Sequence, residues 1–254
     1  MESLEKRFSF RYPHEQALGQ KNKYSVSELK HRAMREKLQQ EEDEVTPAFM
    51  QEEIMPYVPS FVRKLQQEEE QVNQGALRGT AVHRVMECFS FASETDVKEQ
   101  IAEMFDAGKI TEDMKKLVKL PLVEQFVASD VGARMRKAEQ AGKLYREKPF
   151  VMGFTHEELA RFGFGEMKEA VAGEDLTLIQ GIIDVFWEEE DGIVVLDYKT
   201  DRVDTAKQLS DRYAAQLALY GEALERIYND DEVRNVCVKE RLLYSFRLGE
   251  VISV

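Results

Sequence analysis

Two apolar segments, each containing one aspartate, constrain the fold of this chain more than any other feature. They are DLTLIQGIIDVFWEE (175–189) and GIVVLDYKT (192–200), and a short acidic turn with an Asp-Gly pair joins them. Asp-Gly is a common pair at the tip of a β-hairpin. We therefore expect two neighbouring strands in one sheet, with Asp184 and Asp197 close together.

The residues around this aspartate pair indicate a metal site. Asp197 and Lys199 are two apart on a strand, so they share one face and Tyr198 takes the other. Asp184 has apolar flanks, where an uncompensated charge is costly. Two adjacent carboxylates repel unless a proton or a cation bridges them, and carboxylates bind hard cations. The alternatives are a strand-end ion pair, or an Asp184 satisfied by an arginine or by backbone N–H groups.

Two further candidates come from other segments. His83 and Glu87 are four apart in a predicted helix and share a face, and imidazole is a common metal ligand. Glu147, in REKPF, is expected to bind the metal through water or to position the nucleophile. A helix-face histidine without a metal and a partly exposed edge-strand carboxylate are the respective alternatives.

A last pair lies in the long helical segment near the end of the chain. Gln216 and Tyr220 are four apart, so their polar ends can reach a phosphate or brace the site. The alternative is a helix that packs Tyr220 into the core. The sequence contains no Ser-His-Asp or Cys-His arrangement and no Walker-type GxxxxGK[ST], so we expect no ATP site in this chain.

The order of the remaining patterns predicts one α/β domain. Residues 1–60 are expected to form an arm, with a helix starting near Ser25, where Ser25 and Glu28 have capping-box spacing. Residues 61–254 form the main domain: helices over 79–142, strands from 143 to 200, a long helix over 204–228 and closing strands. This order indicates a mixed sheet flanked by helices.

Composition limits the setting of the protein. The net charge of -13 opposes nucleic-acid binding, but acids cluster at 41–44, 67–71 and 188–191 and bases at 109–148. Solvated helix faces explain such runs equally well. Two distant cysteines and no CxxC argue against disulfides, zinc and iron–sulfur clusters. The N-terminus lacks an apolar signal region, and no apolar run is long enough to span a membrane. We expect a cytoplasmic protein.

The ordered set of motifs is more specific than any one of them. It comprises GT-x2-H-x3-E (79–87), REKPF, G-x2-D (181–184), DYKTD (197–201) and Q-x3-Y (216–220). This set resembles the RecB-type branch of the PD-(D/E)XK nucleases. RGTAVHRVME, GIIDVF, VVLDYKTDRV and the upstream KYSVSELK look most like the C-terminal nuclease domain of the AddA subunits of bacterial AddAB helicase–nucleases.

The resemblance implies a fold and a set of roles. The fold is the restriction-endonuclease-like α/β fold, with a central mixed sheet flanked by helices. The ion is Mg²⁺, with Mn²⁺ as a substitute. Its implied ligands are His83, Asp184, Asp197 and the Tyr198 carbonyl. Lys199 would position the attacking water and Glu147 would assist catalysis. The residues implied to support the site or contact DNA are Gln216, Tyr220, Glu87 and Thr200.

The resemblance also implies partners. A helicase region would precede this chain, and an AddB-type subunit would complete the complex. The substrate would be single-stranded DNA delivered by the helicase during double-strand-end processing, with exonuclease-type cleavage of the 3′-terminated strand. Cys88 and Cys237 do not match the cluster cysteines of the AddB-type subunit. The alternatives are a mainly structural module that docks partners, and a stand-alone RecB-like nuclease.

Overall fold

A computed structural model describes residues 23–32, 74–164, 176–229 and 235–254 of the chain. The acidic runs at 41–44 and 67–71 lie outside these ranges, as does the expected boundary at residue 60. That boundary stays a prediction.

A mixed sheet of six strands forms the centre of the described part of the chain, as expected for an α/β fold. β4 pairs with β3 in antiparallel register, with Glu189 opposite Gly192, so the predicted hairpin is confirmed. β5 runs parallel to β4, and β6 is antiparallel to β5. The strands are β1 (Lys23–Ser25), β2 (Leu144–Phe154), β3 (Thr177–Glu189), β4 (Gly192–Lys199), β5 (Val238–Ser245) and β6 (Glu250–Ser253).

The long strand β3 organises the sheet. β2 pairs with it along one edge, from Leu144 opposite Trp187 to Phe154 opposite Thr177. Because β2 pairs along that edge of β3, both β1 and β4 pair along the opposite edge of β3. β1 pairs with residues 178–180 of β3, and β4 with residues 185–189. Asp184 therefore lies in the segment of β3 between the residues that pair with β1 and those that pair with β4.

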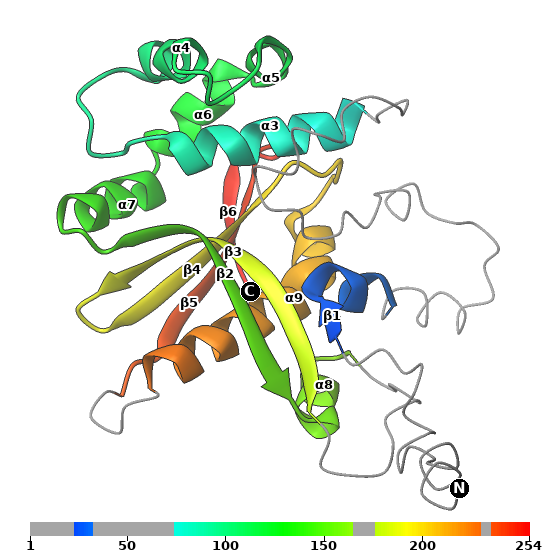
Figure 1. The fold of residues 1–254 in the computed structure, drawn as a ribbon. Helices are drawn as coiled ribbons and strands as arrows, with labels where there is room; N and C mark the ends of the chain where they lie inside the picture. Colours follow the sequence, from blue (N-terminus) through cyan, green and yellow to red (C-terminus); the bar gives the residue numbers. More distant parts are fainter. Residues whose placement is uncertain (1–22, 33–73, 165–175, 230–234) are drawn as a thin grey trace, which may run out of the picture.

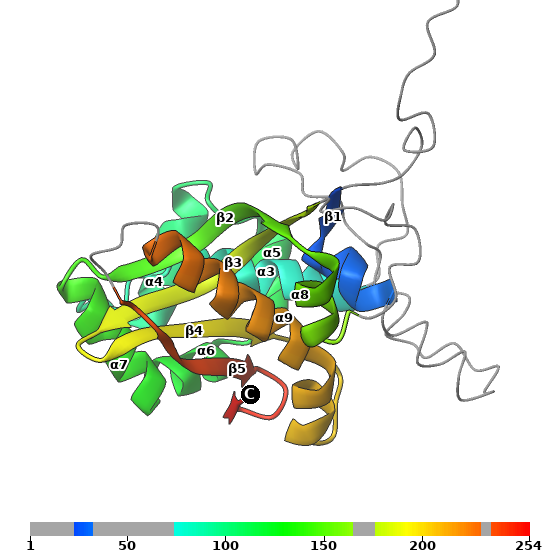
Figure 2. The same cartoon turned by 90° about the horizontal axis from the view of Figure 1, so that it is seen from below.

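Helices cover both faces of the sheet (Figures 1 and 2). One face carries α3 (Gln74–Cys88), α4 (Val97–Asp106), α5 (Glu112–Leu117), α6 (Leu120–Val127) and α7 (Asp130–Gln140). The other carries a helix over 26–32, α8 (His156–Arg161) and α9 (Ala206–Tyr228). Local signals fix several helix starts. The Asp96 side chain caps α4, and a capping box from Thr205 to Gln208 begins α9.

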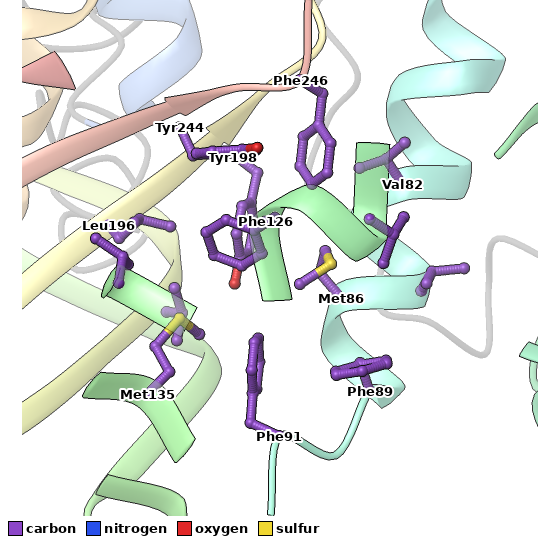
Figure 3. Close-up of a cluster of buried hydrophobic side chains, with 14 of the residues drawn as sticks. Val82, Met86, Phe89, Phe91, Phe126, Met135, Leu196, Tyr198, Tyr244 and Phe246 are labelled. Carbon is purple, nitrogen blue, oxygen red and sulfur yellow. The ribbon is translucent and has the colours of Figure 1, made fainter. Parts of the chain in front are cut away.

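The core on the α3 side is rich in aromatic rings (Figure 3). The Phe126 ring lies 5.5 Å from Tyr198 and 4.4 Å from Tyr244, centroid to centroid. Both tyrosines are at most 3% exposed. Because each belongs to a central strand, this cluster fixes α6 against β4 and β5. It also confirms that Tyr198 points away from the face of Asp197 and Lys199.

The core on the α9 side includes the start of the described chain. Ser25 and Glu28 exchange the two hydrogen bonds of the predicted capping box, and Val26 is buried against the sheet. Gly181 makes this contact possible, because a Cβ there would lie 2.7 Å from the Phe150 ring and 3.0 Å from Val26. The sequence did not indicate that residues 23–25 form a strand of the sheet.

The observed charges are locally matched. Arg134 of α7 pairs with Glu189 and Glu240, and Arg146 pairs with Glu139. Part of the basic segment 109–148 is thus neutralised by acids of the same domain. No helix among the described residues is both long and apolar enough to cross a membrane.

Candidate metal centre

Asp184 is the meeting point of three elements. Its Oδ2 accepts a hydrogen bond of 2.9 Å from the Tyr198 backbone N–H of β4 and lies 3.3 Å from Nδ1 of His83 on α3. The backbone alternative for Asp184 is therefore partly realised, but together with the histidine. The structure brings His83 to Asp184 from more than 100 residues upstream, because α3 lies over the sheet near the end of β4 (Figure 1).

Glu147 completes a set of possible ligands. His83, Glu147 and Asp184 each offer one ligand atom, and these atoms lie within 4.8 Å of one another. Glu147 occurs opposite Asp184 in the β2–β3 register, where the regular ladder is interrupted. It has a φ of 47°, a left-handed conformation that is uncommon for a residue with a Cβ. Such strain persists where surrounding structure enforces it, often at functional sites.

Asp197 and Lys199 form the adjoining part of the site. Both lie on the α9 side of β4, as the alternation predicts, and Lys199 Nζ is 2.5 Å from Asp197 Oδ2. Gln216 of α9 donates through Nε2 to Asp197 Oδ1 at 3.3 Å and to the Tyr220 hydroxyl at 2.9 Å. Tyr220 also packs on Phe150, with ring centroids 5.8 Å apart. Tyr220 thus contacts both Gln216 and the core, and its role in bracing the site stays a prediction.

Burial and charge shift the pKa values in opposite directions. Burial and the neighbouring Asp184 raise the pKa of Asp197 to about 6, although the Lys199 ammonium opposes this. Burial alone would lower the pKa of His83, but Asp184 overcomes it and raises that pKa to about 9. Burial also works against ionisation of Asp184. The nearby His83 nevertheless holds the pKa of Asp184 below its usual value. The site therefore favours a cation beside Asp184.

The donor atoms present fit a hard divalent cation. Asp197 is 2% exposed, and its Oδ2 lies 2.5 Å from the Lys199 ammonium, its partner among the described residues. One imidazole and two carboxylates, with ligand atoms within 4.8 Å of one another, are ligands that such an ion accepts. The structure groups Glu147 with His83 and Asp184, while the sequence favoured Asp197 and the Tyr198 carbonyl. Which of these bind the ion remains a prediction.

Two of the other candidates lie at the periphery. Glu87 forms an ion pair of 2.6 Å with Arg84 on the same helix and is not in the ligand group. The Thr200 carbonyl accepts a hydrogen bond of 3.2 Å from Arg78 Nη2. Supporting roles for Glu87 and Thr200 stay predictions.

Sequence reasoning did not single out Tyr213. Lys199 Nζ lies 4.0 Å from the centre of the Tyr213 ring, which is a cation–π contact. The Tyr213 hydroxyl donates to Asp201 Oδ1 at 2.8 Å, and Arg212 binds the same oxygen. Tyr213 precedes Gln216 by three residues, so both lie on one face of α9. That spacing was the available signal, and Asp201 was already part of the DYKTD motif.

The fold and this site define the class of protein. A mixed sheet with flanking helices carries an aspartate on one strand and Asp-x-Lys on the next, and the family model of the PD-(D/E)XK nuclease superfamily matches residues 56–248. The chain belongs to the PD-(D/E)XK nuclease superfamily.

Within this superfamily, the chain is similar in sequence to proteins of one kind. Over its whole length, the chain is 34% identical to the A subunit of the ATP-dependent helicase/nuclease from Alkaliphilus oremlandii. It is 32% identical over 79% of its length to the protein of that name from Lachnoclostridium phytofermentans, and 30% over 98% to one from Clostridium perfringens. The chain spans only 16% to 19% of the length of these relatives.

Proposed function

We propose that this chain is the nuclease domain of a helicase–nuclease and hydrolyses DNA phosphodiesters with a divalent metal, Mg²⁺ or its substitute Mn²⁺. One observation carries the proposal: the partly buried group of His83, Glu147 and Asp184 adjoins the Asp197–Lys199 pair. The family and the names of the relatives support it.

The side chains divide the work by position. His83, Asp184 and Glu147 would hold the ion, with Asp197 as a further carboxylate in the adjoining part of the site. A bound divalent ion neutralises the scissile phosphate and lowers the pKa of a coordinated water. Lys199 supplies positive charge next to Asp197, where charge develops on the reacting phosphate. Its ammonium lies over the face of the Tyr213 ring.

The α9 residues keep this arrangement in register. Gln216 is 8% exposed and links Asp197 to Tyr220. Because the amide holds one carboxylate oxygen of Asp197, the other stays directed at Lys199. Gln216 and Tyr220 are thus positioning residues in this proposal.

The proposed setting follows the relatives. The substrate would be single-stranded DNA, with cleavage of the 3′-terminated strand by an exonuclease-type activity during repair of double-strand ends. A helicase region of the same polypeptide and an AddB-type subunit would deliver that strand, in the cytoplasm. The alternative, a module that mainly docks partners, expects cleavage by the complex to be independent of Asp197 and Lys199.

Substitution at the site tests the proposal. Asp197→Ala and Lys199→Ala are assayed on labelled single-stranded DNA with Mg²⁺, in this chain and in the complex that contains it. We expect cleavage to fall by about 10²-fold or more, because each removes charge that acts on the transition state. The control is Lys207→Ala, which removes an exposed lysine paired with Asp211 on α9. Cleavage unchanged by both site variants would refute the proposal.

The metal is tested separately by thermal stability. Mg²⁺ or Mn²⁺ at 100 times its Kd stabilises a folded protein by about 2.7 kcal/mol. We expect this stabilisation in the wild type, its loss in Asp184→Asn and a reduction in Glu147→Gln. A Glu147→Gln variant with wild-type affinity would favour the ligand set expected from the sequence.

A further inference from the structure

A basic pocket opens beside the metal site. It has a volume of about 170 Å³ and lies between the first turns of α3, the α5–α6 connection and the end of β5. Thr200, the residue after Lys199, forms part of its wall, and so does Val82, the neighbour of His83. We infer that this pocket is a subsite for one nucleotide of the single DNA strand, next to the phosphodiester that is cut. The inference rests on the proposed function.

The charge of the pocket selects an anionic occupant. Its lining contains Arg78, Lys119 and Arg247 and no acidic residue. Lys119 and Arg247 are exposed, and among the described residues neither forms an ion pair. This contrasts with Arg134 and Arg146, which acids of the domain neutralise. In a chain with a net charge of -13, three cations in a pocket lining without an acidic residue mark a place for phosphate.

The size and floor of the pocket select a nucleotide rather than a free phosphate. Val82, Val123 and Phe246 form an apolar floor and are each at most 5% exposed. An apolar cavity of about 150 Å³ accommodates one benzene ring. A volume near 170 Å³ therefore suits one base ring. A base on the apolar floor with its phosphate at the cationic rim satisfies both parts of the pocket, as in other single-strand sites.

The position of the pocket explains how it would serve cleavage. Arg78 Nη2 donates to the Thr200 carbonyl at 3.2 Å, so the rim is tied to the end of β4. Gly79 allows this approach, because a Cβ there would lie 3.2 Å from Thr200 Oγ1. Thr200 and Val82 of the pocket wall are the sequence neighbours of Lys199 and His83. A nucleotide held here would therefore lie next to the metal site. The pocket would thus fix the register of the strand at the metal.

Removal of the exposed cations tests the charge. The double variant Lys119→Ala/Arg247→Ala is compared with wild type by fluorescence anisotropy of a labelled single-stranded oligonucleotide, in EDTA so that no cleavage occurs. We expect roughly tenfold weaker binding. The slope of log K against log salt should fall by about 1.4, since each phosphate contact on a single strand contributes about 0.7. The control Lys98→Ala/Lys137→Ala removes the same charge outside the pocket.

An abasic scan tests the base. Oligonucleotides with one abasic site at successive positions should show a single position where affinity falls about fivefold or more, the effect of one lost stacking contact. Leu122→Trp, which fills the pocket at a half-buried wall position, should remove that sensitivity. Retention of the wild-type melting temperature shows that the variant is folded.

The outcomes separate this inference from the proposed function. Equal weakening by the pocket and control variants, wild-type binding by the pocket variant, or no sensitive position in the scan overturns the subsite. Selective capture of an acidic peptide instead of DNA overturns it too. The binding assays need neither metal nor hydrolysis, so they test the subsite alone. The nuclease assignment is tested by the cleavage assay, and it would be refuted if Asp197→Ala and Lys199→Ala failed to reduce cleavage.

Discussion

Arg134→Met should destabilise the fold without touching the metal site. Arg134 of α7 donates to both oxygens of Glu189 on β3, at 2.8 and 3.1 Å, and to both of Glu240 on β5, at 2.9 and 2.7 Å. It also lies over the Trp187 ring, 5.5 Å from its centroid. Methionine keeps most of the apolar stem over that ring. The variant therefore isolates the loss of the guanidinium.

The lowered pKa of Glu189 gives the size of the expected loss in the free energy of unfolding. Hydrogen bonds from Arg134, then from Lys239 and Trp187, lower this pKa from 4.5 to about 2. Such a difference between the folded and unfolded chain corresponds to a ceiling of about 3 kcal/mol at neutral pH. Because three donors share it and Glu189 is a quarter exposed, the loss of Arg134 should cost about 2 kcal/mol. That predicts a fall in Tm of about 4–8 °C.

Urea denaturation from pH 7 to pH 3 measures this effect. A carboxyl whose folded pKa is lowered stabilises the protein fully above its ordinary pKa of 4.5 and loses that stabilisation as the pH falls toward 2. The difference between wild type and Arg134→Met should therefore shrink on acidification. The control Lys116→Met breaks an exposed pair with Glu112 and should cost less than about 1 kcal/mol. A pH-independent loss, or one no larger than the control, would refute the reasoning.

Three further predictions concern backbone strain, the lysine and a close contact. Glu147→Gly should be about 1 kcal/mol more stable than Glu147→Ala in thermal denaturation, because φ is 47° there, and equal stabilities would contradict the strain. Tyr213→Leu should reduce cleavage more than Tyr213→Phe, which keeps the ring beneath Lys199; equal activities in single-turnover assays would exclude a role for the ring. Gly181→Val should destabilise by about 1–3 kcal/mol in urea, because its side chain meets Phe150, and a neutral effect would show that the contact gives way.

Local patterns in the sequence determined much of this protein. The Asp-Gly turn and the two apolar segments determined the β3–β4 hairpin, and alternation along β4 placed Asp197 and Lys199 on one face. Capping spacing at Ser25 and Glu28 located a helix start. These features depend on residues near one another in the chain, so periodicity and propensity suffice to predict them.

Only the tertiary structure decided which distant residues meet at the site. The placement of Glu147 opposite Asp184 depends on the β2–β3 register and a left-handed φ, neither of which its sequence context reveals. The Tyr213 ring reaches Lys199 because α9 packs across β4. The basic pocket likewise needs α3, α6 and the end of β5 to converge. Such contacts join segments up to more than 100 residues apart, and long-range packing, which no local pattern records, brings them together.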